Sequence, residues 1–371
     1  MLGTIVMLTA SLSVSEVQNS LGAEAVVSYA ASSSQSKPAI TSVTTAKTTA
    51  TIKWSKVSGA TKYAVYKYTY TGSDKGWSKL AETNSSTLKY KATGLSAKTN
   101  YAFAVRAYVN GAWSDYSDSY VTMTCTAATK ISSVSSSHTS ILVKVKTVSG
   151  VSGYQVAYRK KSSSTWTKKN ISLSSVYNKS GLAYLSLTGL SNNTTYYVKV
   201  RTYVTDSNGV KHYSSFTSKS AKKTLKNKTL KIVTTKASID SCQASSLSGS
   251  FNKAAGKDVA RMINRLRSSK NLGTLKWDET LYKCAKKRAK EIAKAYRNDH
   301  TRPDGSSCGT ISSTYNGENI ARGQTSTIFV YERWYASQCH YENMVSSGFT
   351  RVAVACFKYN GNYYWVTAFG Y

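Results

Sequence analysis

One block of about ninety residues occurs twice in this chain, and this repeat constrains the fold more than any other feature of the sequence. Ile52 to Gly59 (IKWSKVSG) reappears 91 positions later as Val143 to Gly150 (VKVKTVSG). Thr93 to Ser96 (TGLS) reappears 95 positions later as Thr188 to Ser191. A period of this length is that of a whole domain rather than of a solenoid unit, so two copies of one domain are predicted.

Apolar and polar residues alternate within each copy in the manner of β-strands. Tyr101 to Ala107 and Tyr154 to Tyr158 have this period of two, and turns rich in Ser, Gly and Asn separate such segments. The chain contains 28 Tyr and only 2 Pro, and Tyr favours half-buried, pleated surfaces. Each copy is therefore predicted to be an antiparallel β-sandwich.

The two copies, at residues 38–125 and 126–225, resemble fibronectin type III modules. Trp54 stands where that family places a core tryptophan, and Val145 stands there in the second copy, which implies a smaller or repacked core. The resemblance also implies a tyrosine corner in each copy, in which a Tyr hydroxyl bonds to the backbone near a preceding Leu. The two Leu and Tyr pairs are Leu95 with Tyr101 and Leu190 with Tyr196.

Modules of this kind commonly act as spacers that present another domain, and this is the role that we expect here. An alternative stays open, because Trp77, Trp113 and Trp166 are expected to be exposed and aromatic faces can stack on sugar rings.

The first residues have the features of an export signal. Met1 to Val14 is apolar and uncharged, and Ala23-Glu24-Ala25 has the A-x-A form of a cleavage site, with Tyr29-Ala30-Ala31 as a second candidate. We therefore expect residues 1–31 to be a signal peptide and processing region and residues 32–37 to be a polar tether. The protein would then be secreted and extracellular, either free or associated with the cell wall. No later stretch approaches the roughly 20 apolar residues that span a bilayer, so no transmembrane segment is predicted.

The chain is strongly basic, with 50 Lys and Arg against 17 Asp and Glu and a formal net charge of +33. Residues 38–236 hold 30 of the cations against 5 carboxylates, whereas residues 253–371 hold 19 against 9. Such a charge attracts polyanions over about 8–10 Å at ordinary salt, which favours an anionic cell-wall polymer or glycan as a partner. Scattered lysines also keep β modules soluble and protect their edges, so both interpretations stay open. Nucleic acid is disfavoured as a partner, because no dense block of Lys and Arg is present.

The character of the sequence changes after the second copy. Residues 226–252 are rich in Ser and Lys and are predicted to be a linker. In residues 253–371, apolar residues first recur at helical spacing, as from Val259 to Leu266, and later alternate as in strands, as from Val352 to Phe357. This order predicts an α+β domain, in which helices pack on an antiparallel sheet.

Four residues of this last domain have side chains that bind divalent ions or transfer protons near neutral pH. They are His300, Glu318, Glu332 and His340. Each also has an ordinary structural explanation, such as capping a helix or lying exposed on its surface. No H-E-x-x-H or C-x-x-C pattern is present, so their spacing alone does not favour a metal site.

The segments that contain these four residues resemble the bacterial form of the CAP superfamily, named for cysteine-rich secretory, antigen 5 and pathogenesis-related proteins. His300 to Gly305 (HTRPDG) matches its H-T-x-P-D-G segment, and Gly317 to Ala321 (GENIA) contains its G-E-N-I signature. Glu332 to Met344 (ERWYASQCHYENM) is similar to its E-x-W-x-x-S…H-x-x-N-[IM] segment. The resemblance extends over about residues 254–371, with the motifs in the same order.

This resemblance implies a three-layer α-β-α sandwich with a central cleft that the two histidines and two glutamates line. His300 and His340 would bind a divalent metal ion such as zinc, and Glu318 and Glu332 would orient the imidazoles or accept protons. It also implies a secreted, envelope-associated binding protein whose cleft takes a peptide or a small lipid. The alternative is a metal-dependent extracellular hydrolase that acts on peptide or cell-wall substrates, with Glu318 or Glu332 as its catalytic general base.

Six cysteines in a chain with an export signal favour disulfide bonds. A pairing of Cys339 with Cys356 is one candidate, because one precedes a loop and the other lies on the apolar strand that follows. The family resemblance implies a competing pair, Cys308 with Cys339, across the rim of the cleft, because Cys339 replaces the usual Gly before the second histidine. Cys284 is the fourth cysteine of this domain that could take part in a disulfide bond.

Overall fold

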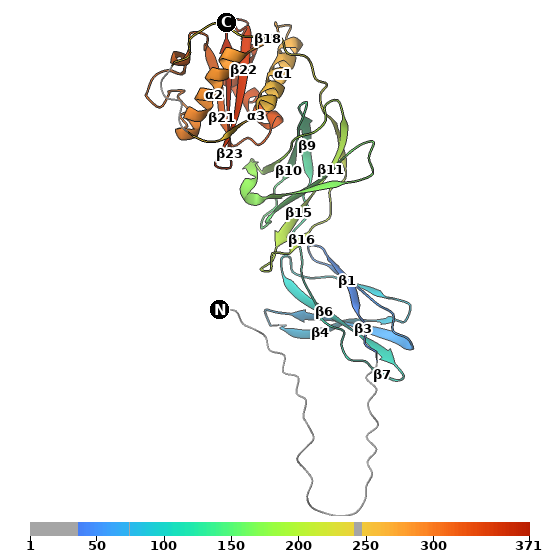
Figure 1. Cartoon of the computed structure of the whole chain (residues 1–371). Helices are drawn as coiled ribbons and strands as arrows, with labels where there is room; N and C mark the ends of the chain where they lie inside the picture. The colour runs from blue at the N-terminus through green and yellow to red at the C-terminus, as the bar shows by residue number, and fades with distance from the viewer. Residues whose placement is uncertain (1–35, 74, 241–246) are drawn as a thin grey trace, which may run out of the picture.

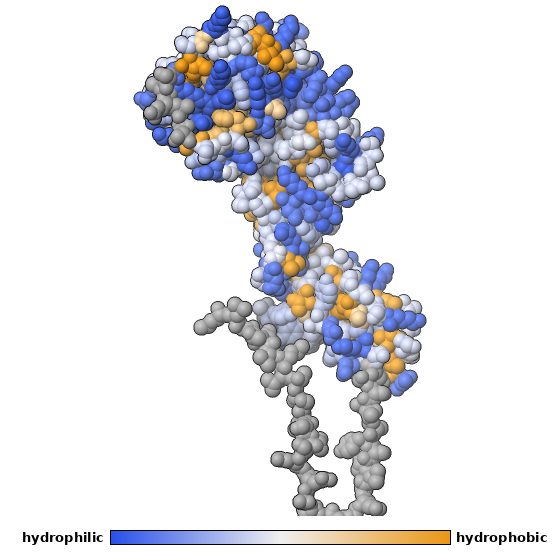
Figure 2. Space-filling model, in the orientation of Figure 1, coloured by the Kyte–Doolittle hydropathy of each residue, from blue (hydrophilic) through white to orange (hydrophobic). Residues whose placement is uncertain are grey.

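The computed structural model describes residues 36–73, 75–240 and 247–371, and it divides them into three bodies arranged in a line (Figure 1). We call them sandwich 1, sandwich 2 and the C-terminal domain. The expected signal peptide and most of the expected tether lie outside the described residues. The space-filling view shows a mostly hydrophilic surface with scattered hydrophobic spots on all three bodies (Figure 2).

Sandwich 1 consists of two antiparallel sheets, one with the strand order β1-β2-β5 and the other with the order β4-β3-β6-β7, in which β8 also pairs with β6. Its core contains Ile52, Trp54 and Tyr63, all of which are buried. The strands are β1 (Ile40–Thr45), β2 (Ala50–Trp54), β3 (Ala60–Thr69), β4 (Gly76–Asn84), β5 (Lys89–Ala92), β6 (Asn100–Val109), β7 (Ala112–Trp113) and β8 (Tyr120–Met123).

Sandwich 2 repeats this arrangement, with one sheet of order β13-β14-β10-β9 and another of order β12-β11-β15-β16, in which β17 also pairs with β15. A short 3-10 helix, η1 (Leu173–Ser175), precedes β13. The strands are β9 (Ile131–Ser136), β10 (Ile141–Lys146), β11 (Gly153–Lys160), β12 (Thr167–Ser172), β13 (Tyr177–Lys179), β14 (Leu182–Leu187), β15 (Thr195–Thr205), β16 (Lys211–Tyr213) and β17 (Ser220–Lys223).

Both predicted tyrosine corners are confirmed. The backbone N–H of Ser96 donates to the Tyr101 hydroxyl at 2.9 Å, and that of Ser191 donates to the Tyr196 hydroxyl at 3.0 Å. Val145, at the position of the missing tryptophan, is fully buried in the core of sandwich 2. The repeat in the sequence is therefore a repeat of the fibronectin type III-like β-sandwich.

The C-terminal domain has one mixed sheet between helices. The sheet has the order β18-β20-β22-β23-β21, and β19 also pairs with β22. Helix α2 packs on β22 and β23, whereas α1 packs on β22 and contacts α3 and α4, which gives the predicted α-β-α layers. The elements are β18 (Ile232–Val233), β19 (Ser250–Phe251), α1 (Lys253–Ser269), β20 (Lys276–Asp278), α2 (Glu279–Lys294), η2 (Cys308–Ile311), β21 (Gly317–Arg322), α3 (Thr327–Tyr335), α4 (Gln338–Val345), β22 (Arg351–Tyr359) and β23 (Asn362–Gly370).

Local sequence explains where α1 and α2 begin and how α1 lies on the sheet. The Asn252 side chain accepts from the Ala255 N–H, and the Asp278 side chain accepts from the Thr280 N–H, so each helix has an N-cap that satisfies free amide groups. A Cβ on Gly256 would lie 2.0 Å from the Val354 carbonyl oxygen of β22. Only glycine therefore allows α1 to approach the sheet this closely.

The segment predicted as a linker, residues 226–252, is instead part of the C-terminal domain as far as the structure describes it. Its β18 pairs in parallel with β20, and its β19 pairs antiparallel to β22. Between them, the Thr235 hydroxyl donates to the Asp278 carboxylate. The Ser and Lys content concealed these strands, because each is only two residues long and has no alternation that a sequence pattern can reveal.

A buried polar network joins sandwich 2 to the C-terminal domain. Asp258 of α1 is fully buried, and its carboxylate lies 2.5 Å from Nδ1 of His138. The hydroxyls of Ser137 and Thr139 donate to the same carboxylate at 2.7 Å, and that of Thr327 donates at 2.8 Å. A buried carboxylate with so many donors is well compensated, so the network fixes how the two domains dock.

Apolar contacts continue this junction. Leu142 of sandwich 2 is fully buried within the hydrophobic core of the C-terminal domain. Tyr184 stacks on Phe329 of α3 with ring centroids 5.1 Å apart. Sandwich 2 therefore contributes Leu142 to the core of the C-terminal domain, while its own core is a separate cluster. None of the helices in the described ranges is both long and apolar enough to cross a membrane.

Candidate functional site

Glu318 of β21 lies at the centre of the predicted site, buried among hydrogen-bond donors. The Arg288 guanidinium of α2 donates to both carboxylate oxygens at 3.0–3.3 Å. The Tyr315 hydroxyl donates to Oε2 at 2.5 Å, and His300 Nδ1 lies 2.8 Å from Oε1. The strand thus presents a carboxylate whose oxygens are both occupied by donors from other elements.

These donors keep the Glu318 carboxylate ionised. Burial by itself would raise its pKa, but the hydrogen bonds from His300, Arg288 and Tyr315 and the Arg288 charge outweigh burial and hold the pKa below its usual value. An ionised carboxylate only accepts hydrogen bonds, so the His300 Nδ1 carries the proton that it donates. Nε2 of a neutral His300 ring then has a free lone pair that can bind a metal ion or accept a proton.

His300 itself is held in an unusual backbone conformation. Its φ of +64° lies in the left-handed region, which non-glycine residues rarely adopt. The Arg288 guanidinium also donates to the His300 carbonyl oxygen at 3.0 Å. The same arginine therefore fixes both the backbone of His300 and the carboxylate that orients its ring. Such strain persists only where the surroundings stabilise it, and functional sites are a common place for it.

His340 of α4 completes the part of the site that the structure brings together. Its Nδ1 lies 2.9 Å from the Ser337 hydroxyl, and its carbonyl oxygen accepts from the Asn319 side chain at 2.9 Å. Burial, followed by the charges of His300 and Arg333, lowers the pKa of His340 below its usual value. The uncharged form of His340 is therefore favoured at neutral pH, and a positive charge on His300 disfavours its protonation further.

Glu332, the fourth predicted residue, points elsewhere. It lies on α3, and its Oε2 forms an ion pair of 2.8 Å with Nζ of Lys144 from β10 of sandwich 2. It also lines a hollow between α1 and sandwich 2, together with Arg265 and Leu225. The structure thus joins His300 directly to Glu318, places His340 within electrostatic range of His300, and places Glu332 at the domain junction. Sequence patterns could not reveal this partner, because Lys144 belongs to another domain.

Neither predicted disulfide bond forms. Cys284, Cys308, Cys339 and Cys356 are all free. Cys356 is buried in the core of the C-terminal domain, whereas Cys339 is exposed on α4, so the first pair is separated by the layer structure of the domain. Cys308 lies beside Glu318 instead of bridging to Cys339, and burial together with the charge of Glu318 raises the pKa of its thiol to about 11.

The supporting residues Arg288 and Tyr315 were not singled out by the sequence patterns. Arg288 has no exposed side-chain surface, although Lys283 of the same helix is exposed. The available signal was its position, because it follows Leu281 and Ala285 on the apolar face of α2. An arginine on a buried helix face requires a carboxylate partner, and here that partner is Glu318.

The two histidines could bind a metal ion, but the described side chains do not provide a full set of ligands for one. His300 and His340 each use Nδ1 in a hydrogen bond and can offer Nε2, and two imidazoles suit zinc. Across the described parts of the chain, no group of three or more His, Cys, Asp or Glu side chains gathers in a manner that could hold a metal. Glu318 is committed to Arg288 and Tyr315, so an ion bound here would need water or a ligand in its remaining positions.

The C-terminal domain is similar to known proteins. The model of the CAP family, described as the cysteine-rich secretory protein family, matches residues 260–369. "Uncharacterized protein YkwD" of Bacillus subtilis (strain 168) is 30% identical over 104 residues, which are 26% of this chain and 40% of that relative. The chain thus spans less than half of the length of the curated relative that it matches.

Solved structures similar to the chain contain fibronectin type III domains. A segment of two such domains from chicken tenascin is 17% identical, with a TM-score of 0.24, and the match covers 51% of this chain and 99% of that one. The FN1–FN3 domains of chicken CNTN1 are 20% identical, with a TM-score of 0.29, and the match covers 52% of this chain and 66% of that one.

Proposed function

Residues 260–369 form a CAP domain of the cysteine-rich secretory protein family, and from this premise we propose that the chain is a secreted protein that binds a ligand through His300 and His340. Sandwich 1 and sandwich 2 would present this domain at the cell envelope. The ligand classes that the family resemblance suggests are a peptide or a small lipid, with a divalent ion such as zinc between the two histidines.

Glu318 and Glu332 are both bonded to other side chains, and this supports a binding function rather than hydrolysis. A hydrolase of the kind considered needs a carboxylate that accepts a proton from water. Glu318 is held ionised by Arg288, Tyr315 and His300, and these bonds disfavour its protonated form. Glu332 is paired with Lys144 at the domain junction. The two residues that would serve as general base are therefore used to hold the structure.

The hydrolase remains the second candidate, because the uncharged form of His340 is favoured at neutral pH and a neutral imidazole can accept a proton. A zinc ion bound by two histidines would lower the pKa of a bound water and so supply a nucleophile. In this function the chain's own contribution would be to orient His300 through Glu318 and to keep His340 neutral.

Charge supplies the proposed link to the envelope. The sandwich region carries most of the net positive charge of the chain, and anionic wall polymers would attract it through a field that salt screens. Retention of the protein on isolated cell walls should therefore fall steeply as salt is added, whereas retention that salt leaves unchanged would contradict this role of the charge.

Zinc titration of the full chain tests the proposed site. After chelation, calorimetry with zinc chloride should detect one ion per chain, and His300→Ala and His340→Ala should each abolish this binding. His212→Ala is the matched control, because this histidine of sandwich 2 is paired with Asp206 away from Glu318. Zinc binding that survives in His300→Ala would refute the assignment. Turnover of a peptide or peptidoglycan by the zinc-loaded protein, abolished in Glu318→Gln, would establish the hydrolase instead.

A further inference from the structure

The outward face of one sheet in sandwich 2 carries cations and aromatic rings in alternation. Strand β15 turns Tyr196, Val198 and Val200 into the core. Because side chains alternate along a strand, Lys199 and Arg201 point away from the core, on the outer face of the β12-β11-β15-β16 sheet.

Aromatic rings on both sides of these two cations form a ladder. Nζ of Lys199 lies 4.4 Å from the ring centroid of Trp166 and 4.5 Å from that of Phe216. The Arg201 guanidinium lies 4.4 Å from the ring of Phe216 and 3.9 Å from that of Tyr213. We call Trp166, Lys199, Phe216, Arg201 and Tyr213 the cation–aromatic ladder. Such contacts hold the long side chains in place without cancelling their charge.

No carboxylate neutralises the ladder. Within the described ranges, neither Lys199 nor Arg201 forms an ion pair, and the only side-chain hydrogen bond of Arg201 is to the neutral Gln155 oxygen at 2.9 Å. The ladder therefore presents ordered positive charge, which is the pattern that an anionic chain would recognise.

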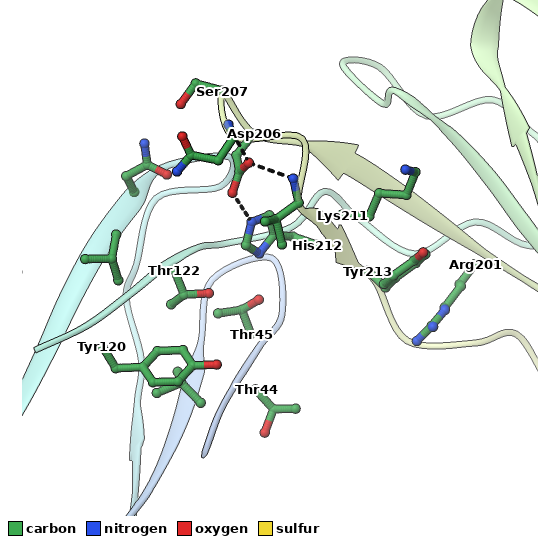
Figure 3. A pocket seen from close by; sticks show the side chains of 15 residues that line it. Thr44, Thr45, Tyr120, Thr122, Arg201, Asp206, Ser207, Lys211, His212 and Tyr213 are labelled. Atoms are coloured by element: carbon green, nitrogen blue, oxygen red, sulfur yellow. Dashed lines mark hydrogen bonds and ion pairs between the residues drawn. The ribbon is translucent and has the colours of Figure 1, made fainter. Parts of the chain in front are cut away.

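A hollow of about 450 Å³ lies where the Arg201 end of the ladder meets sandwich 1 (Figure 3). Sandwich 2 lines it with Arg201, Lys211 and Tyr213, and sandwich 1 lines it with Tyr120 and threonines that include Thr45. Tyr120 is 40% exposed, so part of its ring is free to contact a ligand. Hydroxyl, aromatic and cationic groups thus converge on one space.

The one carboxylate that lines this hollow, Asp206, is already satisfied. It accepts from the backbone N–H groups of Asn208 and Val210 at 2.9 Å each, and Nε2 of His212 lies 2.8 Å from its other oxygen (Figure 3). Its charge is therefore directed into its own turn and its histidine. Arg201 and Lys211 remain available to an incoming anion.

We propose that this hollow binds an acidic unit of an anionic polysaccharide and that the cation–aromatic ladder carries the adjoining part of the polymer. Carboxylate or phosphate groups would pair with Arg201 and Lys211, sugar hydroxyls would bond to the threonines, and a sugar face would stack on Tyr120. The inference rests on the proposed retention by anionic envelope polymers and assigns it to one face of the molecule. It is independent of His300 and His340.

The test compares two triple variants of the full chain that lose the same charge. Lys199→Gln, Arg201→Gln and Lys211→Gln remove the charges of the proposed site. Lys53→Gln, Lys89→Gln and Lys91→Gln remove three exposed lysines of β2 and β5 in sandwich 1. The probes are oligogalacturonate for the carboxylate source, a phosphomannan for the phosphate source, neutral dextran, and single-stranded DNA.

If the proposed site is correct, an anionic polysaccharide should bind the natural chain and the control variant of sandwich 1 with equal affinity. The first triple should bind it about tenfold or more weakly, and dextran should not bind. Whichever of the two anionic polymers binds more tightly shows whether the site prefers carboxylate or phosphate groups. Equal weakening in both triples would overturn the site and leave retention by bulk charge standing, whereas no binding of either anionic polymer would overturn both. Tighter binding of DNA would replace the polysaccharide with nucleic acid.

Tyr120→Ala provides a second test that changes no charge. It should weaken binding of the anionic polymer severalfold while leaving the circular dichroism spectrum unchanged. If the first triple fails to fold, this variant decides the question, and an unchanged affinity in Tyr120→Ala would refute the site.

Discussion

Lys144 of sandwich 2 lies 2.8 Å from Glu332 of α3, so a residue expected in the ligand site is an ion-pair partner across a domain junction. Near this ion pair, the buried contacts of Asp258 and Leu142 hold sandwich 2 against the C-terminal domain. The sandwich next to the CAP domain is thus more than a spacer, because it determines where a side chain of α3 points.

Separating Lys144 from Glu332 should cost little stability. Both side chains are about a quarter exposed, so a double-mutant cycle of Lys144→Gln and Glu332→Gln should give a coupling of about 0.5–1 kcal/mol in urea unfolding. Zinc affinity should be unchanged in Glu332→Gln, since the residue lies outside the histidine site. A large loss of zinc affinity in this variant would place Glu332 with the histidines after all.

Removing the Asp258 carboxylate should be far more damaging. Asp258→Ala leaves the hydroxyls of Ser137, Thr139 and Thr327 without their acceptor in a buried junction, so we expect a loss of about 3 kcal/mol or more in the free energy of unfolding. Asp118→Ala, which among the described residues breaks only the exposed pair with Lys37, should cost less than about 1 kcal/mol. Equal effects in the two variants would refute the role of the junction network.

Acid should loosen the same junction. Burial opposes ionisation of Asp258, but hydrogen bonds from His138, Ser137, Thr139 and Thr327 outweigh it and lower the pKa below its ordinary value. A carboxyl group whose pKa is lower in the folded state adds stability above its unfolded pKa of about 3.9 and loses it as the pH falls through the folded value. Limited proteolysis should therefore find the junction intact at about pH 5 and increasingly cleaved below about pH 4. An Asp258→Asn variant that follows the same pH profile would contradict this assignment.

Replacing Glu318 should destabilise the CAP domain as well as alter its site. Glu318→Gln leaves the buried Arg288 guanidinium without its main counter-charge, which should cost about 3 kcal/mol in chemical unfolding. Glu342→Gln is the control, because Glu342 is exposed and bonds only to Gln338 among the described residues. Adding Arg288→Met to Glu318→Gln should restore part of the loss, because it removes the uncompensated charge. If Arg288→Met does not restore any stability, the loss in Glu318→Gln comes from altered packing rather than from the uncompensated charge.

The free cysteines should differ sharply in reactivity. Cys339 is exposed, so a maleimide should modify it in the native protein. Cys284 and Cys356 are buried, and burial raises the pKa of their thiols to about 11 and about 12, so they should react only after unfolding. Mass spectrometry of digested, labelled protein would identify each site. A disulfide-linked peptide that joins Cys339 to Cys356 would contradict the structure.

Features that depend on short stretches of chain could be read from the amino-acid order. The tyrosine corners of Tyr101 and Tyr196 were predictable, since each joins residues five positions apart and the strand pattern around them repeats. The α-β-α arrangement followed from the resemblance, and so did the proximity of His300 to Glu318, because the two motifs occur together in that family.

Only the tertiary structure decided the features that join distant segments or separate domains. The partner of Glu332, the burial of Asp258 against His138, and the absence of a bond between Cys339 and Cys356 all depend on how finished domains and layers dock. A side chain's type limits what it can bind, but its partner is set by geometry that no local pattern encodes. For this reason the sequence alone determined the kinds of domain and the histidine motifs. The packing of the domains determined which side chains pair with Glu332 and Asp258.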